Sequence, residues 1–214
     1  MWTFNIKKED KRRKSRLAVG SHVVDASSFN AFSLVMQNLS IWLLLLITKA
    51  NNLQMSTGDV GNSCLSTNVG ESAHFYAKEE WGDKNSHVLE TTNASHGLKT
   101  STWQWSLCLG NALREMGFKP SQTDPDLWMK LYPHHSSYDW IGTFVDELIM
   151  VSKEPLQCSE VLARKLNLRN ATHSPSFFLG TNWENDKNRT RISNESCIKD
   201  NMRNHEEDHD SIRK

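Results

Sequence analysis

A pair of apolar runs separated by two acidic residues constrains the fold of this chain more than any other feature. The runs, Trp140 to Val145 and Leu148 to Val151, are rich in β-branched and aromatic residues, and only Asp146 and Glu147 lie between them. Short runs of this composition are typical of strands, and so short a connection joins antiparallel neighbours. The sequence therefore predicts a hairpin over 139–152 with two acidic residues at its tip.

The two acidic residues allow two interpretations. Carboxylates on a rigid hairpin can hold Mg²⁺ while the phosphates of a substrate complete the octahedral shell. Acidic residues also favour turns for backbone reasons, so a solvated turn without chemistry is the alternative. A carboxylate at a second strand end would favour the metal. Asp59 is the candidate, because it follows Leu53, Met55 and Thr57, whose alternation indicates a half-buried strand.

Apolar spacing indicates three helices. Over 31–50, six apolar residues recur at steps of three and four and are expected to form a wide buried face: Leu34, Val35, Leu39, Trp42, Leu43 and Leu46. Further helices are expected over 103–116, which Gly117 ends, and over 155–168, where Pro155 suits the first turn. With a further strand over 127–132, these elements predict an α+β fold.

Charge and length limit the class of protein. The chain has 214 residues, with 25 Lys and Arg against 25 Asp and Glu, so its overall field cannot attract nucleic acid and any such binding must be local. The mostly basic run over 7–16 is the local candidate. Its charge also argues against a signal peptide, and the apolar run over 41–47 is far shorter than the ~20 residues that cross a bilayer. An intracellular, cytoplasmic protein is expected.

Six segments occur in an order that matches a known family. They are Lys14-Ser15-Arg16-Leu17-Ala18-Val19-Gly20; Gly58-Asp59-Val60-Gly61-Asn62; Gly97-Leu98-Lys99 with Trp105; Gly117-Phe118-Lys119-Pro120-Ser121 through Asp124-Pro125-Asp126-Leu127-Trp128; Phe144-Val145-Asp146-Glu147; and Phe178-Leu179-Gly180. Together they resemble the reverse transcriptase of copia-type retrotransposons, whose motifs include K-A-R-L-V-A-G, G-F-x-x-S-x-x-D-P-x-x-[WF], Y-V-D-D and Y-L-G. The resemblance covers almost the whole chain.

The resemblance implies a right-hand polymerase palm, an antiparallel sheet backed by helices, with partial fingers. Incomplete fingers are expected over 1–57 and the first catalytic motif of the palm over 58–69. A returning fingers segment is expected over 70–98, the rest of the palm over 99–184, and the start of the thumb or connection with a polar tail over 185–214.

The resemblance also implies a chemistry. In this family the first-motif Asp and the paired hairpin acids bind two Mg²⁺ ions, for which Mn²⁺ can substitute, and the matching residues here are Asp59, Asp146 and Glu147. Residues that match the family's nucleotide and template contacts are Lys14, Arg16, Cys64, Gly97, Lys99, Ser101 and Phe144. The implied partners are an RNA template with a DNA primer and deoxynucleoside triphosphates, with no membrane.

Departures from the family pattern fall on these motifs. Glu147 replaces Asp and is longer by one methylene, in a site where ~1 Å of misplacement can cost ~100-fold in rate. Phe144 lacks the tyrosine hydroxyl, Cys64 replaces an aromatic residue, and His96 replaces a tyrosine. We expect a diverged fragment that lacks most of its fingers and thumb, is impaired in activity, and leaves the apolar residues around Trp42 to Leu46 and Trp103 to Trp105 uncovered. The alternative is a non-catalytic remnant that at most binds nucleic acid through Lys11 to Arg16.

Two histidine patterns have simpler explanations than a metal site. His205-Glu206-Glu207-Asp208-His209 fits the zinc-protease pattern H-E-x-x-H. Its flanks are polar and only five residues follow it, so a solvated acidic tail is expected. His134-His135 is expected to be a turn.

Overall fold

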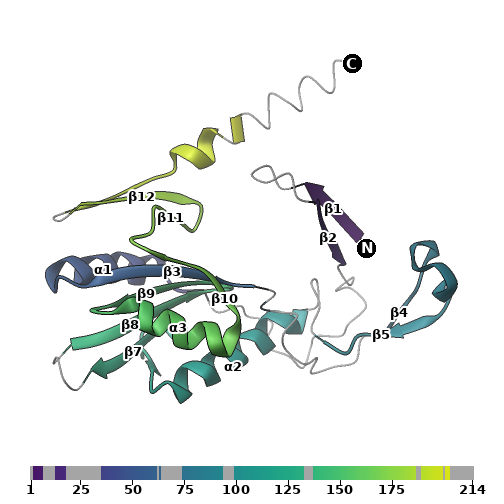
Figure 1. Ribbon diagram of the computed structural model, residues 1–214, viewed down its shortest axis with the longest axis horizontal. Helices are drawn as coiled ribbons and strands as arrows, with labels where there is room; N and C mark the ends of the chain where they lie inside the picture. Colours follow the sequence, from purple (N-terminus) through teal and green to yellow (C-terminus); the bar gives the residue numbers. More distant parts are fainter. Residues whose placement is uncertain are drawn as a thin grey trace. The chain divides into compact units, whose positions relative to one another are not determined.

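The computed structural model describes residues 2–6, 13–17, 35–61, 63, 74–93, 99–132, 137–186, 189–199 and 201–202. Contacts divide the chain into two compact units, residues 1–35 with 61–117 and residues 36–60 with 118–214. Helices and antiparallel sheets occur together, which confirms the α+β class (Figure 1).

The first unit contains two small antiparallel ribbons and one long helix. Strand β1 (Trp2–Ile6) pairs with β2 (Arg13–Leu17), and β4 (His74–Tyr76) pairs with β5 (Val88–Glu90). A 3₁₀ segment, η3 (Glu79–Lys84), connects β4 to β5. Helix α2 (Lys99–Glu115) ends two residues before the predicted stop, Gly117, which lies in the following turn with φ of +87°. Trp105 is only 2% exposed, so the expectation that its surroundings are uncovered is wrong.

The second unit is built on a six-stranded antiparallel sheet in the order β10-β3-β9-β8-β7-β6. Its strands are β3 (Gln54–Val60), β6 (Lys119–Pro120), β7 (Leu127–Tyr132), β8 (Ser137–Phe144), β9 (Glu147–Ser152) and β10 (Leu168–His173). The predicted strand over 127–132 is confirmed as β7. Strand β3 is buried along most of its length instead of alternating, because β9 and β10 flank it and helices cover both of its faces.

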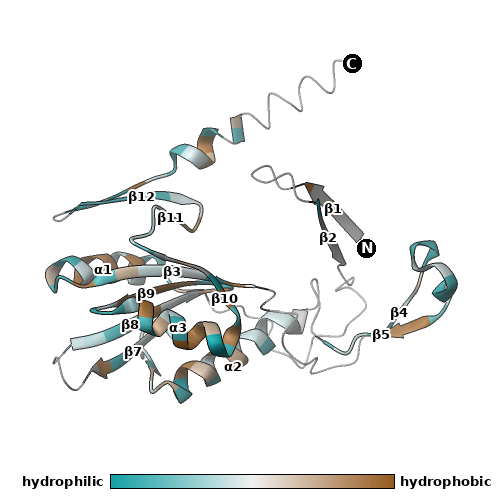
Figure 2. Cartoon of the chain, viewed as in Figure 1, coloured by the Kyte–Doolittle hydropathy of each residue, from teal (hydrophilic) through white to brown (hydrophobic). Residues whose placement is uncertain are grey.

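Helices α1 (Asn38–Ala50) and α3 (Pro155–Leu166) cover opposite faces of this sheet. Met55 belongs to the hydrophobic cluster with α1, whereas the hydroxyl of the next residue, Ser56, lies 3.2 Å from that of Ser159 in α3. Neighbouring residues on a strand point to opposite faces, so the two helices lie on different sides. Hydrophobic and hydrophilic residues alternate along α3, as expected of a helix with one face on a sheet (Figure 2).

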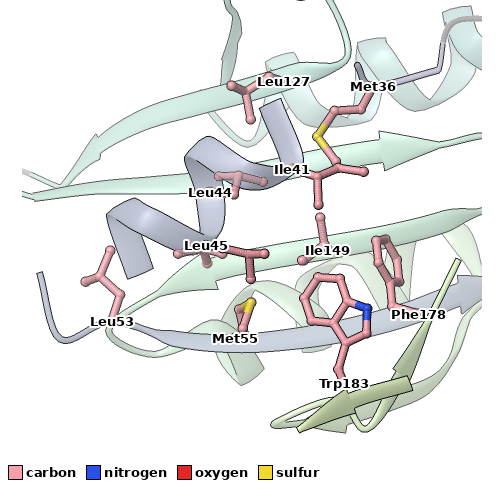
Figure 3. Packing of buried hydrophobic residues seen from close by; sticks show 11 residues of the cluster. Met36, Ile41, Leu44, Leu45, Leu53, Met55, Leu127, Ile149, Phe178 and Trp183 are labelled. Atoms are coloured by element: carbon pink, nitrogen blue, oxygen red, sulfur yellow. The ribbon is translucent and has the colours of Figure 1, made fainter. Parts of the chain in front are cut away.

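The main hydrophobic core lies between α1 and the sheet. Figure 3 shows Ile41, Leu44 and Leu45 of α1 directed toward the sheet residues Met55 and Ile149. A second sheet of three strands closes one end of this core: β11 (Phe177–Phe178), β12 (Thr181–Asn185) and β13 (Thr190–Ser193). Its Phe178 and Trp183 contact each other edge to face, with ring centroids 5.5 Å apart.

Helix α1 buries a different face from the one predicted. Its buried residues are Ser40, Ile41, Leu44, Leu45 and Thr48. The predicted stripe is exposed instead, with Leu39 at 75%, Trp42 at 59%, Leu43 at 44% and Leu46 at 65%. The helix also begins at Asn38, after an extended Gln37, and not at residue 31; residues 31–34 lie outside the described part of the chain.

Within the described ranges, no helix is both long enough and apolar enough to cross a membrane.

Candidate functional site

The β8–β9 hairpin forms as predicted, but its tip is shifted by one residue. Phe144 pairs with Glu147, so Val145 and Asp146 form the two-residue turn and Glu147 is the first residue of β9. Val145 has φ of +57°, a conformation that two-residue hairpin turns often need at this position and that glycine adopts most easily. A β-branched residue there is strained, typically by about 1–3 kcal/mol, and such strain is often found at functional sites.

The hairpin lies beside the strand that carries Asp59. In the β3–β9 ladder Asp59 is directly opposite Glu147, and the N–H of Val60 donates a 2.8 Å hydrogen bond to the carbonyl of Asp146. Directly opposed residues in an antiparallel pair share a face, with Cβ atoms about 4.5–5.5 Å apart. Asp59, Glu147 and Phe144 therefore form a row across β3, β9 and β8, with Asp146 in the adjoining turn.

A pocket of about 230 Å³ opens at this row. Its lining residues come from four strands: Thr57, Gly58, Asp59, Glu147, Thr172, Phe177 and Phe178. Gly58 is a close-approach glycine, because a Cβ there would lie 2.8 Å from Cδ1 of Leu168. Two carboxylates thus share a small pocket with two aromatic residues of β11.

The carboxylate of Glu147 is partly buried and hydrogen bonded. Its Oε2 accepts a 3.2 Å hydrogen bond from the backbone N–H of Leu179. Burial raises the pKa of Glu147, the Leu179 hydrogen bond lowers it, and the negative charges of Asp146 and Asp59 raise it further. The net direction is upward, because removal from water and two like charges outweigh one hydrogen bond.

These carboxylates meet only part of the requirement for a divalent cation. Carboxylate oxygens are suitable donors for Mg²⁺, and Asp59 and Asp146 belong to adjoining elements. However, the described residues contain no group of three or more His, Cys, Asp or Glu side chains able to hold a metal ion. The donor chemistry of Asp59 and Asp146 fits a metal, whereas Glu147 already uses Oε2 to accept the Leu179 N–H, and the roles of all three as ligands stay predictions.

The structure describes four further predicted contact residues, on other elements. Lys14 and Arg16 lie on β2, opposite Asn5 and Thr3, and Lys99 and Ser101 lie in the first turn of α2, where Ser101 is buried. All four belong to the first unit. The remaining predicted residues lie outside the described part of the chain: Cys64, His96, Gly97, His134-His135 and His205 to His209.

Two contributors to the site could not be assigned from sequence spacing. Leu179 acts through its backbone N–H, which any residue could supply; only the resemblance of Phe178-Leu179-Gly180 to a family motif drew attention to this segment. Arg169 on β10 lies directly opposite Asp59, on the side away from Glu147. It places a cation beside the candidate ligand, and no motif pointed to it.

Carboxylates gathered at the ends of neighbouring strands of an antiparallel sheet suit chemistry on phosphorylated substrates. The sequence model of the family described as reverse transcriptase (RNA-dependent DNA polymerase) matches residues 1–207, nearly the whole chain. The chain therefore belongs to the reverse transcriptase family. Neither a curated protein nor a solved structure matches it.

Proposed function

We propose that this chain is the RNA-directed DNA polymerase domain of a copia-type retrotransposon, with the second unit as its palm. The observation that carries the proposal is the pairing of Asp59 with Glu147 beside a turn that contains Asp146, in a chain of the reverse transcriptase family. These residues stand at the family's first catalytic motif and at its Y-V-D-D hairpin, and the ladder brings the two motifs side by side.

In this proposal Asp59 and Asp146 hold Mg²⁺, and Mn²⁺ can replace it. The metal would neutralise the triphosphate and activate the primer 3′ hydroxyl, which is the chemistry that phosphoryl transfer requires. Phe144, on the row with Glu147, would contact the nucleotide through its ring. Lys14, Arg16, Cys64, Gly97, Lys99 and Ser101 remain proposed contacts for nucleotide or template, and RNA template, DNA primer and deoxynucleoside triphosphates are the proposed partners.

Impaired activity is part of the proposal. Glu147 stands where the family has Asp, and its carboxylate is bonded to Leu179. Arg169 opposite Asp59 adds a positive charge that competes with a cation for that carboxylate. Both features lower the affinity expected for a metal at this site.

Primer extension on a poly-rA template with an oligo-dT primer tests the proposal. The assay is run with Mg²⁺ and then with Mn²⁺, which tolerates less regular ligand geometry, and Asp59→Asn and Asp146→Asn serve as matched inactive variants. We expect weak incorporation that is stronger with Mn²⁺ and absent in both variants. No incorporation with either metal, or incorporation unchanged in the variants, rejects the polymerase assignment.

A non-catalytic nucleic-acid-binding remnant is the second candidate. One observation favours it: the five-residue strand β2 contains Arg13, Lys14 and Arg16, a local group of positive charges. This candidate predicts salt-sensitive RNA binding that Lys14→Ala with Arg16→Ala weakens, together with no incorporation in the extension assay.

A further inference from the structure

We propose that Glu147 is a positioning residue that docks the β11–β12 turn onto the catalytic hairpin through Leu179, and that it is not a metal ligand. The metal half of this inference rests on the proposed function, whereas the docking half does not. The argument uses the geometry of the β11–β12 turn, the length of the glutamate side chain and the packing of the residues beside it.

The β11–β12 turn has a backbone donor that its own hairpin does not use. Phe178 pairs with Thr181, so Leu179 and Gly180 form a two-residue turn, with φ of +49° and +73°. Two positive φ values define a type I′ turn, in which the N–H of the first central residue points away from the ladder. The carboxylate of Glu147 accepts that N–H, from a residue 32 positions earlier.

This turn needs support from outside. Type I′ turns favour Asn or Gly at the first central position, and Leu179 has neither the small size nor the local hydrogen bonding that makes positive φ inexpensive. A charged acceptor makes a stronger hydrogen bond than a neutral one, so the Glu147 carboxylate can offset part of this strain.

The length of Glu147 matters for this contact. The observed donor–acceptor distance is 3.2 Å, already at the long end of the usual range. Aspartate is shorter by one methylene, or about 1.5 Å, and would leave its oxygens out of reach of Leu179 without a backbone shift. The residue that replaces the family's Asp is therefore the one that can reach the turn.

The packing next to Leu179 links the docking to the core. Phe178 is 3% exposed and Trp183 is 4% exposed, and both belong to the cluster under α1. Phe178 also lines the pocket that contains Glu147 and Asp59. Loss of the Leu179 contact should therefore loosen the wall of this pocket as well as the turn.

Two substitutions separate docking from metal binding in the full chain. Glu147→Gln keeps the length and an acceptor oxygen for Leu179 but removes the charge. Glu147→Asp keeps the charge but loses the reach. Glu160→Gln, at an exposed glutamate of α3, is the matched control for loss of a negative charge.

The docking readout is hydrogen exchange of the Leu179 amide, followed by NMR of chain labelled with ¹⁵N-leucine. Loss of a hydrogen bond worth about 1.4 kcal/mol corresponds to a tenfold change, so we expect Glu147→Asp to speed this exchange about tenfold and Glu147→Gln to change it less than about threefold. Unchanged exchange in Glu147→Asp overturns the docking role. If Glu147→Asp does not fold, Glu147→Gln is compared with a variant that is destabilised elsewhere in the chain. Equally fast exchange of the Leu179 amide in these two proteins overturns the docking role.

The metal readout is Mn²⁺ binding, measured by electron paramagnetic resonance of the free ion. We expect the Kd of Glu147→Gln for Mn²⁺ to stay within about twofold of that of the Glu160→Gln control. A tenfold weakening of Mn²⁺ binding would show that Glu147 is a ligand and would overturn the second half of the inference. Asp59→Asn and Asp146→Asn test the proposed function separately. If they leave Mn²⁺ binding unchanged while Leu179 exchange behaves as expected, the metal site fails and the docking role stands.

Discussion

The side-chain carboxylate of Asp124 accepts a 3.0 Å hydrogen bond from the backbone N–H of Gln37, although 87 positions separate the two residues. Gln37 is the N-cap residue of α1 and its own side chain makes no capping hydrogen bond. The hydroxyl of Ser40 donates to the same oxygen of Asp124. Asp124 therefore caps the helix from a distant loop, and its negative charge lies at the positive end of the helix dipole.

The same loop is tied to the strand that leads into the candidate site. Asp124 accepts from the N–H of Asp126, whose carboxylate accepts a 3.0 Å hydrogen bond from the hydroxyl of Thr143. Thr143 in turn accepts, through its carbonyl, a 3.1 Å hydrogen bond from the N–H of Met36. The Asp-Pro-Asp segment thus connects the start of α1 to β8, three residues before Asp146.

Replacing Asp124 with alanine should lower the free energy of unfolding by about 2 kcal/mol, because buried donors at the start of α1 would lose their acceptor. Urea unfolding followed by circular dichroism measures the change. Gln122→Ala, at an exposed position of the same loop, should change stability by less than about 0.5 kcal/mol. Equal effects of the two substitutions would show that the cap contributes nothing.

The pH dependence of stability should carry a contribution from Asp126. Burial and the charge of Asp124 raise its pKa to about 6, against the hydrogen bond from Thr143, which lowers it. Between about pH 4 and pH 6 the folded protein keeps a proton that the unfolded chain has released, so stability from this group falls as pH rises through that window. Asp126→Asn removes the ionisation and keeps an acceptor for Thr143.

We therefore expect Asp126→Asn to be more stable than the parent chain at pH 7, by up to about 3 kcal/mol, with the difference vanishing near pH 4. Urea unfolding of both proteins across this range gives the comparison. A constant difference at all pH values would mean that Asp126 does not titrate in this range.

Gly142 on β8 should not tolerate a side chain while Met36 is present. A Cβ at this position would collide with Sδ of Met36 and lie 2.9 Å from Cγ2 of Ile149. Gly142→Ala should cost about 1–3 kcal/mol of stability, and less in a Met36→Ala background, where space has been created. A double-mutant cycle measures this coupling. Strict additivity would indicate that Met36 and β8 do not approach as closely as the structure shows.

The exposed apolar stripe of α1 should cause self-association of the isolated chain, because apolar patches on a soluble surface promote association. Replacing Leu39 and Leu46, which are 75% and 65% exposed, with lysine should lower the sedimenting mass and leave unfolding unchanged. Leu44→Lys is the matched buried control and should unfold the chain. A monodisperse parent chain in sedimentation velocity would contradict this prediction.

The sequence predicted most elements correctly where a strong local signal existed. Pro155 marked the first turn of α3, Gly117 marked the end of α2, and the apolar runs around the acidic pair marked β8 and β9. The turn of the β8–β9 hairpin lies one residue earlier than predicted. Val145 favours strands by composition, but the register of the ladder imposes a positive φ on it. The neighbouring strand, and not local propensity, decides which residue occupies such a position.

The candidate site was predicted in part. The order of the motifs identified Asp59, Asp146 and Glu147, and the β3–β9 register places Asp59 opposite Glu147. Their roles as metal ligands stay predictions. The partner of the Glu147 carboxylate could not be predicted, because a backbone N–H leaves no mark in the sequence.

By itself, the sequence determined the family, the α+β class and the hairpin with its acidic pair, because each depends on local composition or on motifs in a fixed order. The tertiary structure alone decided which side of α1 is buried. That helix is apolar on most of its circumference, so spacing offers two faces of similar hydrophobicity. The contact of Asp124 with Gln37 and Ser40 fixes where the helix begins, and its packing on the sheet selects the face that contains Leu44 over the one that contains Trp42.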